Sequence, residues 1–256
     1  MGKKRLVLPG AFLFYNGSSL LRRLLAFLIR YFKLGSFRIL SMELNAKHVF
    51  ITGTDTGVGK SIFSAFLALY WHDQGKKVAI SKPVQTGAEK DTDFLSMLTG
   101  NKIPVFNSYS FNLPAAPLVA AKYKNREIDI EKIILDIRKL EQEFEYVIVE
   151  GIGGIAVPIT DNYLVADLIK DLNYPVVIVA RPSLGTINHT NLTIEFAKQK
   201  ELDILGFVIS GFDESINDPV IKTASEVISQ ITSINCVMKL KQIDKSNLAS
   251  VKFAHL

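Results

Sequence analysis

A glycine-rich segment ending in lysine and serine contains the residues of this chain best suited to chemistry. It reads Gly53-Thr54-Asp55-Thr56-Gly57-Val58-Gly59-Lys60-Ser61, between an apolar run at 49–51 and an apolar segment of helical period at 62–71. In such a turn between strand and helix, backbone N–H groups surround a phosphate, the lysine reaches the terminal phosphates and the serine hydroxyl ligates Mg²⁺. The sequence therefore predicts a nucleotide-binding loop made by Asp55, Thr56, Gly57, Val58, Gly59, Lys60 and Ser61.

The spacing within this loop is a variant of the usual one. Five residues lie between Gly53 and Gly59, whereas the common phosphate-loop pattern has four. A tight turn without a ligand is the alternative interpretation. The strand before the turn and the helix after it favour the phosphate-binding interpretation.

A parallel sheet with helices on both faces is the architecture that would position this loop. Continuous apolar runs recur at 49–51, 78–81, 146–149, 176–179 and 204–209. Segments of helical period separate most of them, at 62–72, 130–143, 164–172, 187–200 and 219–231. Strands that are apolar throughout are typical of a sheet covered on both sides. The chain is thus predicted to be one doubly wound α/β domain of the P-loop type, with residues 100–126 as its longest irregular part.

Charged residues directly follow two of these runs, at the end of the sheet where ligands bind. Lys82 ends the second run and could aim its ammonium at an anion, or could simply be a solvated strand end. Glu150 leaves the third run for a glycine-rich turn, and a buried carboxylate needs a partner such as a divalent metal. Asp91 and Asp93 could each add a carboxylate or cap the helix that follows, and for Asp91 the cap is the preferred interpretation.

A further turn, 184–189, follows the run at 176–179 and opens a helix, so its N–H groups could hold a carboxylate or phosphate. Asn188 and His189 could instead be ordinary cap residues. A nucleotide loop, a metal pair, a second lysine and a separate anion-binding turn together suit phosphoryl transfer to an acceptor.

The net charge of +5 comes from the first 42 residues, which contain eight of the 30 basic residues and no acidic one. The remaining 22 basic residues face 25 acidic ones in residues 43–256, so no nucleic-acid partner is expected. Residues 1–42 are interpreted as a gene-start or cloning artefact before Met42, an amphipathic targeting or membrane-surface segment, or a disordered arm. They contain no uninterrupted apolar stretch of the roughly 20 residues that a membrane span needs. The single cysteine, Cys236, is expected to be a buried small residue, compatible with a cytoplasmic location.

Taken in order, these motifs resemble dethiobiotin synthetases, from about Lys47 to Gly211. The matching pieces are the phosphate loop with its five intervening residues, Lys82-Pro83-Val84 with Thr86-Gly87, Asp93 at a helix start, Pro114 and Pro117, Val149-Glu150-Gly151 with Gly153-Gly154, and Leu184-Gly185 with Ile187-Asn188-His189. The resemblance implies ATP- and Mg²⁺-dependent conversion of 7,8-diaminononanoate and CO₂ to dethiobiotin. An amine would capture CO₂ as a carbamate, ATP would phosphorylate it, and the second amine would close the cyclic urea and expel phosphate.

The resemblance also implies roles for individual residues. Lys60, Lys82 and Thr54 would be catalytic, and Ser61, Asp93 and Glu150 would hold Mg²⁺. The residues in substrate-binding positions are Thr86, Gly151, Gly185, Thr186, Ile187 and Asn188. The turn from Gly185 to Asn188 would grip the substrate's carboxylate from a partner subunit, which makes a homodimer part of the expected active site.

Two departures from the family concern the nucleotide base. Ser210, predicted to bind nucleotide, and Gly211 stand where an Asn-Asp pair usually reads adenine, and Met238-Lys239-Leu240-Lys241 replaces a proline-containing segment. A relaxed nucleotide preference is therefore expected.

Three other kinds of protein are alternatives to this prediction. A partition or metal-carrier ATPase of the same superfamily would carry a signature lysine where this chain has Asp55. A regulatory nucleotide-binding protein with little turnover would need neither Lys82 nor the anion-binding turn. A cobyrinate amidotransferase would need a glutaminase domain with a nucleophilic cysteine, and Cys236 lies in no such motif.

Overall fold

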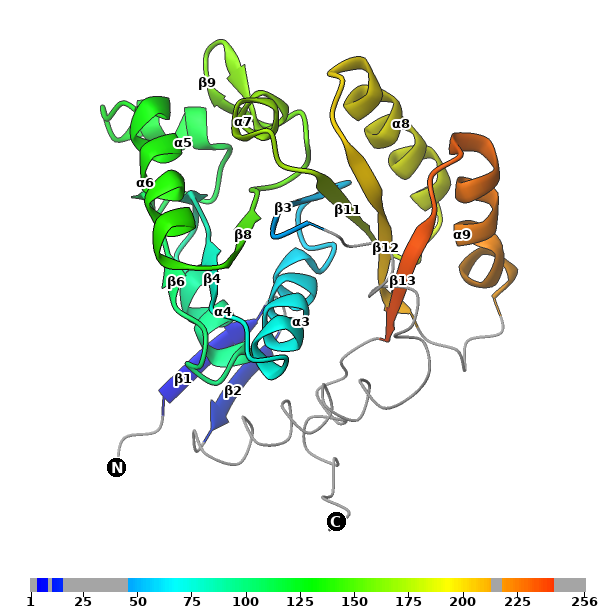
Figure 1. Ribbon diagram of the computed structural model, residues 1–256, viewed down its shortest axis with the longest axis horizontal. Helices are drawn as coiled ribbons and strands as arrows, with labels where there is room; N and C mark the ends of the chain where they lie inside the picture. The colour runs from blue at the N-terminus through cyan, green and yellow to red at the C-terminus, as the bar shows by residue number, and fades with distance from the viewer. Residues whose placement is uncertain (1–3, 9–10, 16–45, 213–217, 242–256) are drawn as a thin grey trace.

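The central feature of the molecule is a seven-stranded sheet (Figure 1). The computed structural model describes residues 4–8, 11–15, 46–212 and 218–241. The strand order is β13-β12-β11-β3-β8-β4-β6, and every neighbouring pair is parallel. The strands are β3 His48–Gly53, β4 Val78–Ser81, β6 Val105–Phe106, β8 Tyr146–Glu150, β11 Val176–Ala180, β12 Ile204–Phe212 and β13 Cys236–Lys241. This confirms the predicted doubly wound α/β fold.

Helices cover both faces of the sheet. The helices are α3 Lys60–Asp73, α4 Asp91–Leu98, α5 Pro117–Tyr123, α6 Ile130–Glu143, α7 Val165–Leu172, α8 Thr186–Gln199 and α9 Pro219–Thr232. Alternate residues of β3 enter different cores: Val49 and Ile51 pack in the cluster that includes α3, and Phe50 packs in the cluster that includes α6 and α7. Since successive side chains of a strand point to opposite faces, this division shows that β3 is buried on both sides.

Three short strand pairs lie outside the main sheet. β5 Val84–Gln85 pairs in parallel with β7 Tyr109–Ser110, and β9 Pro158–Thr160 pairs with β10 Tyr163–Leu164. Residues 4–8 and 11–15 form an antiparallel hairpin, β1 Lys4–Leu8 with β2 Ala11–Tyr15, which was not predicted from the sequence. The interpretations of residues 1–42 otherwise fall outside the described residues.

The structure differs from the sequence predictions at three places. The stretch 100–126, expected to be irregular, contains β6, β7 and α5. An additional edge strand, β13, ends the sheet, and Cys236 at its start is half-buried rather than buried. An edge strand is covered less completely than a central one, which explains both the lysines in its sequence and the partial exposure of its cysteine.

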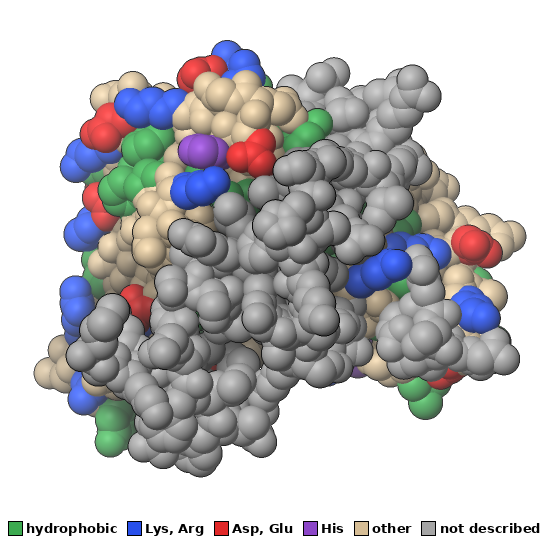
Figure 2. All heavy atoms as spheres, turned by 90° about the horizontal axis from the view of Figure 1, so that it is seen from below, with side chains coloured by type: hydrophobic (Ala, Val, Ile, Leu, Met, Phe, Trp, Pro, Cys, Tyr) green, Lys and Arg blue, Asp and Glu red, His purple; other side chains and the backbone are tan. Residues whose placement is uncertain are grey.

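The surface of the described residues mixes both signs of charge. On the face seen in Figure 2, their Lys and Arg side chains are interspersed with Asp and Glu rather than gathered in one patch. None of the helices in the described part of the chain has the length and apolar character required to cross a membrane.

Candidate active site

The phosphate-binding loop connects the end of β3 to the start of α3. Gly59 has a φ of +99°, in the left-handed region that favours glycine, and Lys60 begins the helix. A Cβ atom on Gly59 would lie 2.2 Å from Ser210 Oγ, so β12 packs directly against the loop. Helix α3 has no side-chain cap, which leaves first-turn N–H groups available for an anion.

Lys60 is a buried lysine whose partner in the loop is a carbonyl group. Its Nζ donates to the backbone oxygen of Asp55 at 3.0 Å, and the residue is 7% exposed. Burial, together with the positive charge of Lys82, lowers the pKa of Lys60 to about 8. A phosphate group near this ammonium would favour its charged form, so the loop is electrostatically suited to an anionic ligand.

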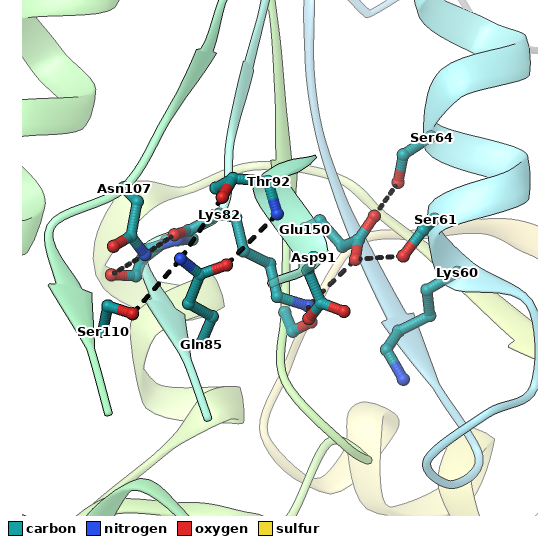
Figure 3. A network of polar contacts seen from close by, with 12 residues as sticks. Lys60, Ser61, Ser64, Lys82, Gln85, Asp91, Thr92, Asn107, Ser110 and Glu150 are labelled. Atoms are coloured by element: carbon teal, nitrogen blue, oxygen red, sulfur yellow. Dashed lines mark hydrogen bonds and ion pairs between the residues drawn. The ribbon is translucent and has the colours of Figure 1, made fainter. Parts of the chain in front are cut away.

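A buried carboxylate lies beside the loop, at the carboxyl end of β8. Glu150 is fully buried and accepts hydrogen bonds from Ser61 Oγ at 2.8 Å and from Ser64 Oγ at 2.6 Å. Lys82 Nζ donates to the same Glu150 Oε1 that Ser61 contacts, at 2.9 Å (Figure 3). Both oxygens of the carboxylate are thus occupied, which offsets much of the cost of burying its charge.

Lys82 is the cation at the centre of this group. Its side chain is 2% exposed, and its Nζ also contacts Asp91 Oδ2 at 2.7 Å and the backbone oxygen of Gly151 at 2.9 Å. Burial alone would lower the pKa of Lys82, but the carboxylates of Glu150 and Asp91 outweigh burial and raise it. The side chain therefore stays protonated, between the two carboxylates.

Helix α4 brings Asp91, and not Asp93, to this group. Asp91 is the first residue of α4, and the N-cap is Lys90, so the preferred interpretation of Asp91 as a helix cap is wrong. Asp93 is exposed and makes no ion pair with any described residue. Residues two apart on a helix point to different sides, so Asp91 and Asp93 cannot both face Lys82.

Oxygen donors suitable for Mg²⁺ converge here. The hydroxyl of Ser61 contacts Glu150, and the carboxylates of Glu150 and Asp91 both contact Lys82. Phosphate oxygens of a nucleotide would supply further ligands. The described residues contain no cluster of three His, Cys, Asp or Glu side chains that could hold a metal alone. The donor set fits a cation shared with a nucleotide rather than a site made by protein alone.

The second turn predicted to bind an anion follows β11. Gly185, with a φ of +91°, precedes α8, and Thr186 is its first residue. The buried hydroxyls of Thr186 and Thr190 have no hydrogen-bond partner among the described residues, and Leu184 is 89% exposed. Arg181, at the start of the same connection, forms an ion pair with Asp55 and so links this segment to the phosphate-binding loop.

Comparison with known proteins agrees with this arrangement. A family model described as an AAA domain matches residues 47–249. The ATP-dependent dethiobiotin synthetase BioD of Methanococcus vannielii is 38% identical over 191 residues, which cover 74% of this chain and 90% of that protein. That of Bacillus subtilis is 34% identical over 217 residues, covering 81% of this chain and 94% of that protein.

The chain belongs to the dethiobiotin synthetase family. Solved structures of more distant proteins share the fold of this family member. A ParA family ATPase from Chlorobium tepidum has a TM-score of 0.54 at 15% identity, covering 80% of this chain and 89% of its own. The MinC:MinD cell division protein complex of Aquifex aeolicus has a TM-score of 0.53 at 15% identity, covering 81% of this chain and 87% of its own.

The structure of this synthetase-family chain brings four of the predicted residues together: Lys60, Ser61, Lys82 and Glu150. The predicted residues of the second turn lie elsewhere, at the carboxyl end of β11, where Thr186 is buried, Ile187 half-buried and Asn188 exposed. The remaining predicted residues lie around strand ends. Thr54 donates its N–H to the backbone oxygen of Val179 at 3.0 Å, and Thr86 is half-buried after β5.

Three residues of the cluster were missed or undervalued by sequence reasoning. Ser64 lies three residues after Ser61, on the same face of α3, and this helical spacing was a usable signal. Asp91 was interpreted chiefly as a helix cap rather than as a site residue. Gln85 contacts the first turn of α4, and no sequence pattern marks that contact.

Proposed function

We propose that this protein is an ATP-dependent dethiobiotin synthetase of biotin biosynthesis, a ligase that forms the two C–N bonds of a cyclic urea from 7,8-diaminononanoate and CO₂. The 38% identity to a dethiobiotin synthetase of which 90% is covered carries this proposal. One amine captures CO₂ as a carbamate, and ATP phosphorylates the carbamate to a carbamic–phosphoric anhydride. The second amine then attacks the carbonyl carbon and expels phosphate, leaving ADP.

Charge neutralisation is the main task of the protein in this sequence of steps. The carbamate and the γ-phosphate are both anions, and their approach is opposed by Coulomb repulsion. Lys60 from the loop and Lys82 from the end of β4 supply two buried cations on the same side of the sheet. We propose that Thr54 contacts the carbamate and the phosphate, because it lies directly after β3, in the loop that also carries Lys60. The other loop residues, Asp55 to Ser61, hold the phosphates.

We propose that Ser61, Glu150 and Asp91 hold Mg²⁺ together with the nucleotide phosphates. Mg²⁺ bound there would screen the charge that builds up as the phosphoryl group is transferred. Asp91 is proposed as the metal ligand instead of Asp93, because Asp91 contacts Lys82, which also contacts Glu150. Lys82 would keep the two carboxylates apart and oriented until a cation and a nucleotide arrive.

The substrate would lie between the two turns. Thr86 and Gly151 would line it on one side, and the turn from Gly185 to Asn188 would hold its carboxylate. The protein is proposed to be a homodimer in which this turn serves the partner's site. The protein is proposed to act in the cytoplasm, and residues 43–256 are proposed to form the catalytic domain.

Product formation tests this function. The full chain is incubated with 7,8-diaminononanoate, bicarbonate, Mg²⁺ and ATP, and dethiobiotin is measured by mass spectrometry. A matched reaction without bicarbonate should give none. Absence of product with ATP, GTP and CTP would refute the proposal. The same assay tests base preference: relaxed recognition predicts that ATP exceeds GTP and CTP by less than about a hundredfold in kcat/KM, or roughly 2.7 kcal/mol.

A further inference from the structure

Helix α4, which carries Asp91, begins without a cap of its own. Its N-cap residue, Lys90, has an extended conformation and its side chain makes no capping hydrogen bond. The helix has eight residues, and a helix this short is not stable by itself. Something outside the helix must therefore fix the direction in which its first turn points.

Gln85 supplies that missing cap from another element. Its Oε1 accepts the backbone N–H of Thr92 at 3.1 Å, and its Nε2 donates to Thr92 Oγ1 at 3.3 Å and to Ser110 Oγ at 3.4 Å (Figure 3). Gln85 is 4% exposed, and its backbone is paired with Ser110 between β5 and β7. Its amide thus has defined partners on both sides and little freedom to move.

Lys90 fixes the other side of Asp91. Its Nζ donates to the backbone oxygens of Gly87 at 2.9 Å and Phe111 at 3.2 Å, and to Asn112 Oδ1 at 3.1 Å. The residues before and after Asp91 are both attached to the segments that include β5 and β7. The carboxylate of Asp91 is itself 40% exposed, so its position depends on a fixed backbone rather than on enclosure.

We propose that Gln85 is a positioning residue that holds Asp91 against Lys82 and thereby completes the metal-binding side of the site. Gln85 lies three residues after Lys82 on the same segment, so one short piece of chain carries the cation and determines where its partner carboxylate points. Without Gln85 the first turn of α4 would fray, and the half-exposed carboxylate would turn to water. The effect on metal binding rests on the proposed function of Asp91, whereas the effect on α4 does not.

The experiment compares Gln85→Met, which keeps the volume and removes the amide, with Gln85→Glu, which keeps an acceptor for Thr92 N–H and can accept from both hydroxyls. Hydrogen exchange of the Thr92 amide is measured in the metal-free full chain. We expect roughly tenfold faster exchange in Gln85→Met and near wild-type exchange in Gln85→Glu. Exchange within twofold of wild type in Gln85→Met would overturn the proposal.

A second measurement separates positioning from general damage. Mn²⁺ affinity is measured by electron paramagnetic resonance with a non-hydrolysable ATP analogue bound, in wild-type and Asp91→Asn backgrounds. Gln85→Met should weaken Mn²⁺ binding about fivefold in the wild-type background and cause no further loss in Asp91→Asn. An equal loss in both backgrounds would overturn the proposal, as would Asp91→Asn that leaves Mn²⁺ affinity unchanged. If the wild-type protein makes no dethiobiotin, the proposed function fails, whereas the hydrogen-exchange measurement still tests the role of Gln85 in α4.

Discussion

Replacing Lys82 by methionine removes the only cation that contacts the fully buried Glu150 among the described residues. Lys82 Nζ lies 2.9 Å from Glu150 Oε1 and 2.7 Å from Asp91 Oδ2. At an effective dielectric constant near 20, unit charges about 3 Å apart attract by roughly 5–6 kcal/mol. Desolvation of the charges cancels much of this attraction, but removing one partner leaves a buried charge without compensation, at a cost of about 3–5 kcal/mol.

We therefore expect Lys82→Met to lower the free energy of unfolding by about 3–5 kcal/mol. The measurement is urea denaturation in EDTA without nucleotide, followed by the fluorescence of Trp71, the single tryptophan of the chain, which is 4% exposed. Adding Glu150→Gln should recover about 2 kcal/mol, since it removes the uncompensated charge. Asp91 contributes little to the loss because it is 40% exposed and can be solvated by water.

A surface pair provides the matched control. Lys170 Nζ and Glu201 Oε2 are also 2.9 Å apart, but their side chains are 52% and 81% exposed. Lys170→Met should cost less than about 1 kcal/mol, as is usual for exposed ion pairs. A loss for Lys82→Met no larger than this control, or no recovery with Glu150→Gln, would refute the interpretation of a buried charge cluster. Turnover should be lost in Lys82→Met, while ATP binding is retained.

Three further predictions concern the loop and the metal site. The pKa of Lys60 is about 8, and a bound phosphate would raise it. Nucleotide binding above pH 8 should therefore take up a proton, and the affinity should fall as the pH rises, by up to about tenfold per pH unit. Calorimetry in buffers of different ionisation enthalpy measures the proton uptake, and a pH-independent affinity would contradict the prediction. Gly59→Ala should abolish nucleotide binding and lower the free energy of unfolding by about 2 kcal/mol or more. The positive φ at this position disfavours alanine, and the added Cβ would collide with Ser210. Unchanged nucleotide binding in a filter assay would contradict this prediction. Asp91→Asn should raise the Mg²⁺ concentration needed for half-maximal turnover at least about tenfold, and Asp93→Asn should raise it less than about twofold. The opposite order of effects would show that Asp93 is the ligand.

Much of the fold could be predicted because its strands are buried on both faces. A parallel strand covered by helices must be apolar throughout, so β3, β8 and β11 stand out as continuous runs. The edge strand β13 did not stand out, because lysines at 239 and 241 interrupt its apolar pattern and an edge tolerates them. Helix α5 was missed because the prolines of residues 100–126 were interpreted as a sign of a loop, although Pro117 at the first helical position is favourable.

The functional residues at the strand ends could be identified from the sequence alone. Gly59, Lys60 and Ser61 follow β3, Lys82 follows β4 and Glu150 ends β8, and parallel strands carry their carboxyl ends to one edge of the sheet. Their proximity therefore follows from the fold class. Which reaction the site serves came from the order and spacing of several motifs together.

The packing of separate elements shows which aspartate joins these residues and what holds it in place. Asp91 and Asp93 are equivalent in residue type and two positions apart, and nothing local distinguishes them. The choice depends on the direction of the first turn of α4, which is set by the hydrogen bond from Thr92 to Gln85, a residue of a different element. Contacts between separate elements depend on the path of the chain between them, and a local sequence pattern does not record that path.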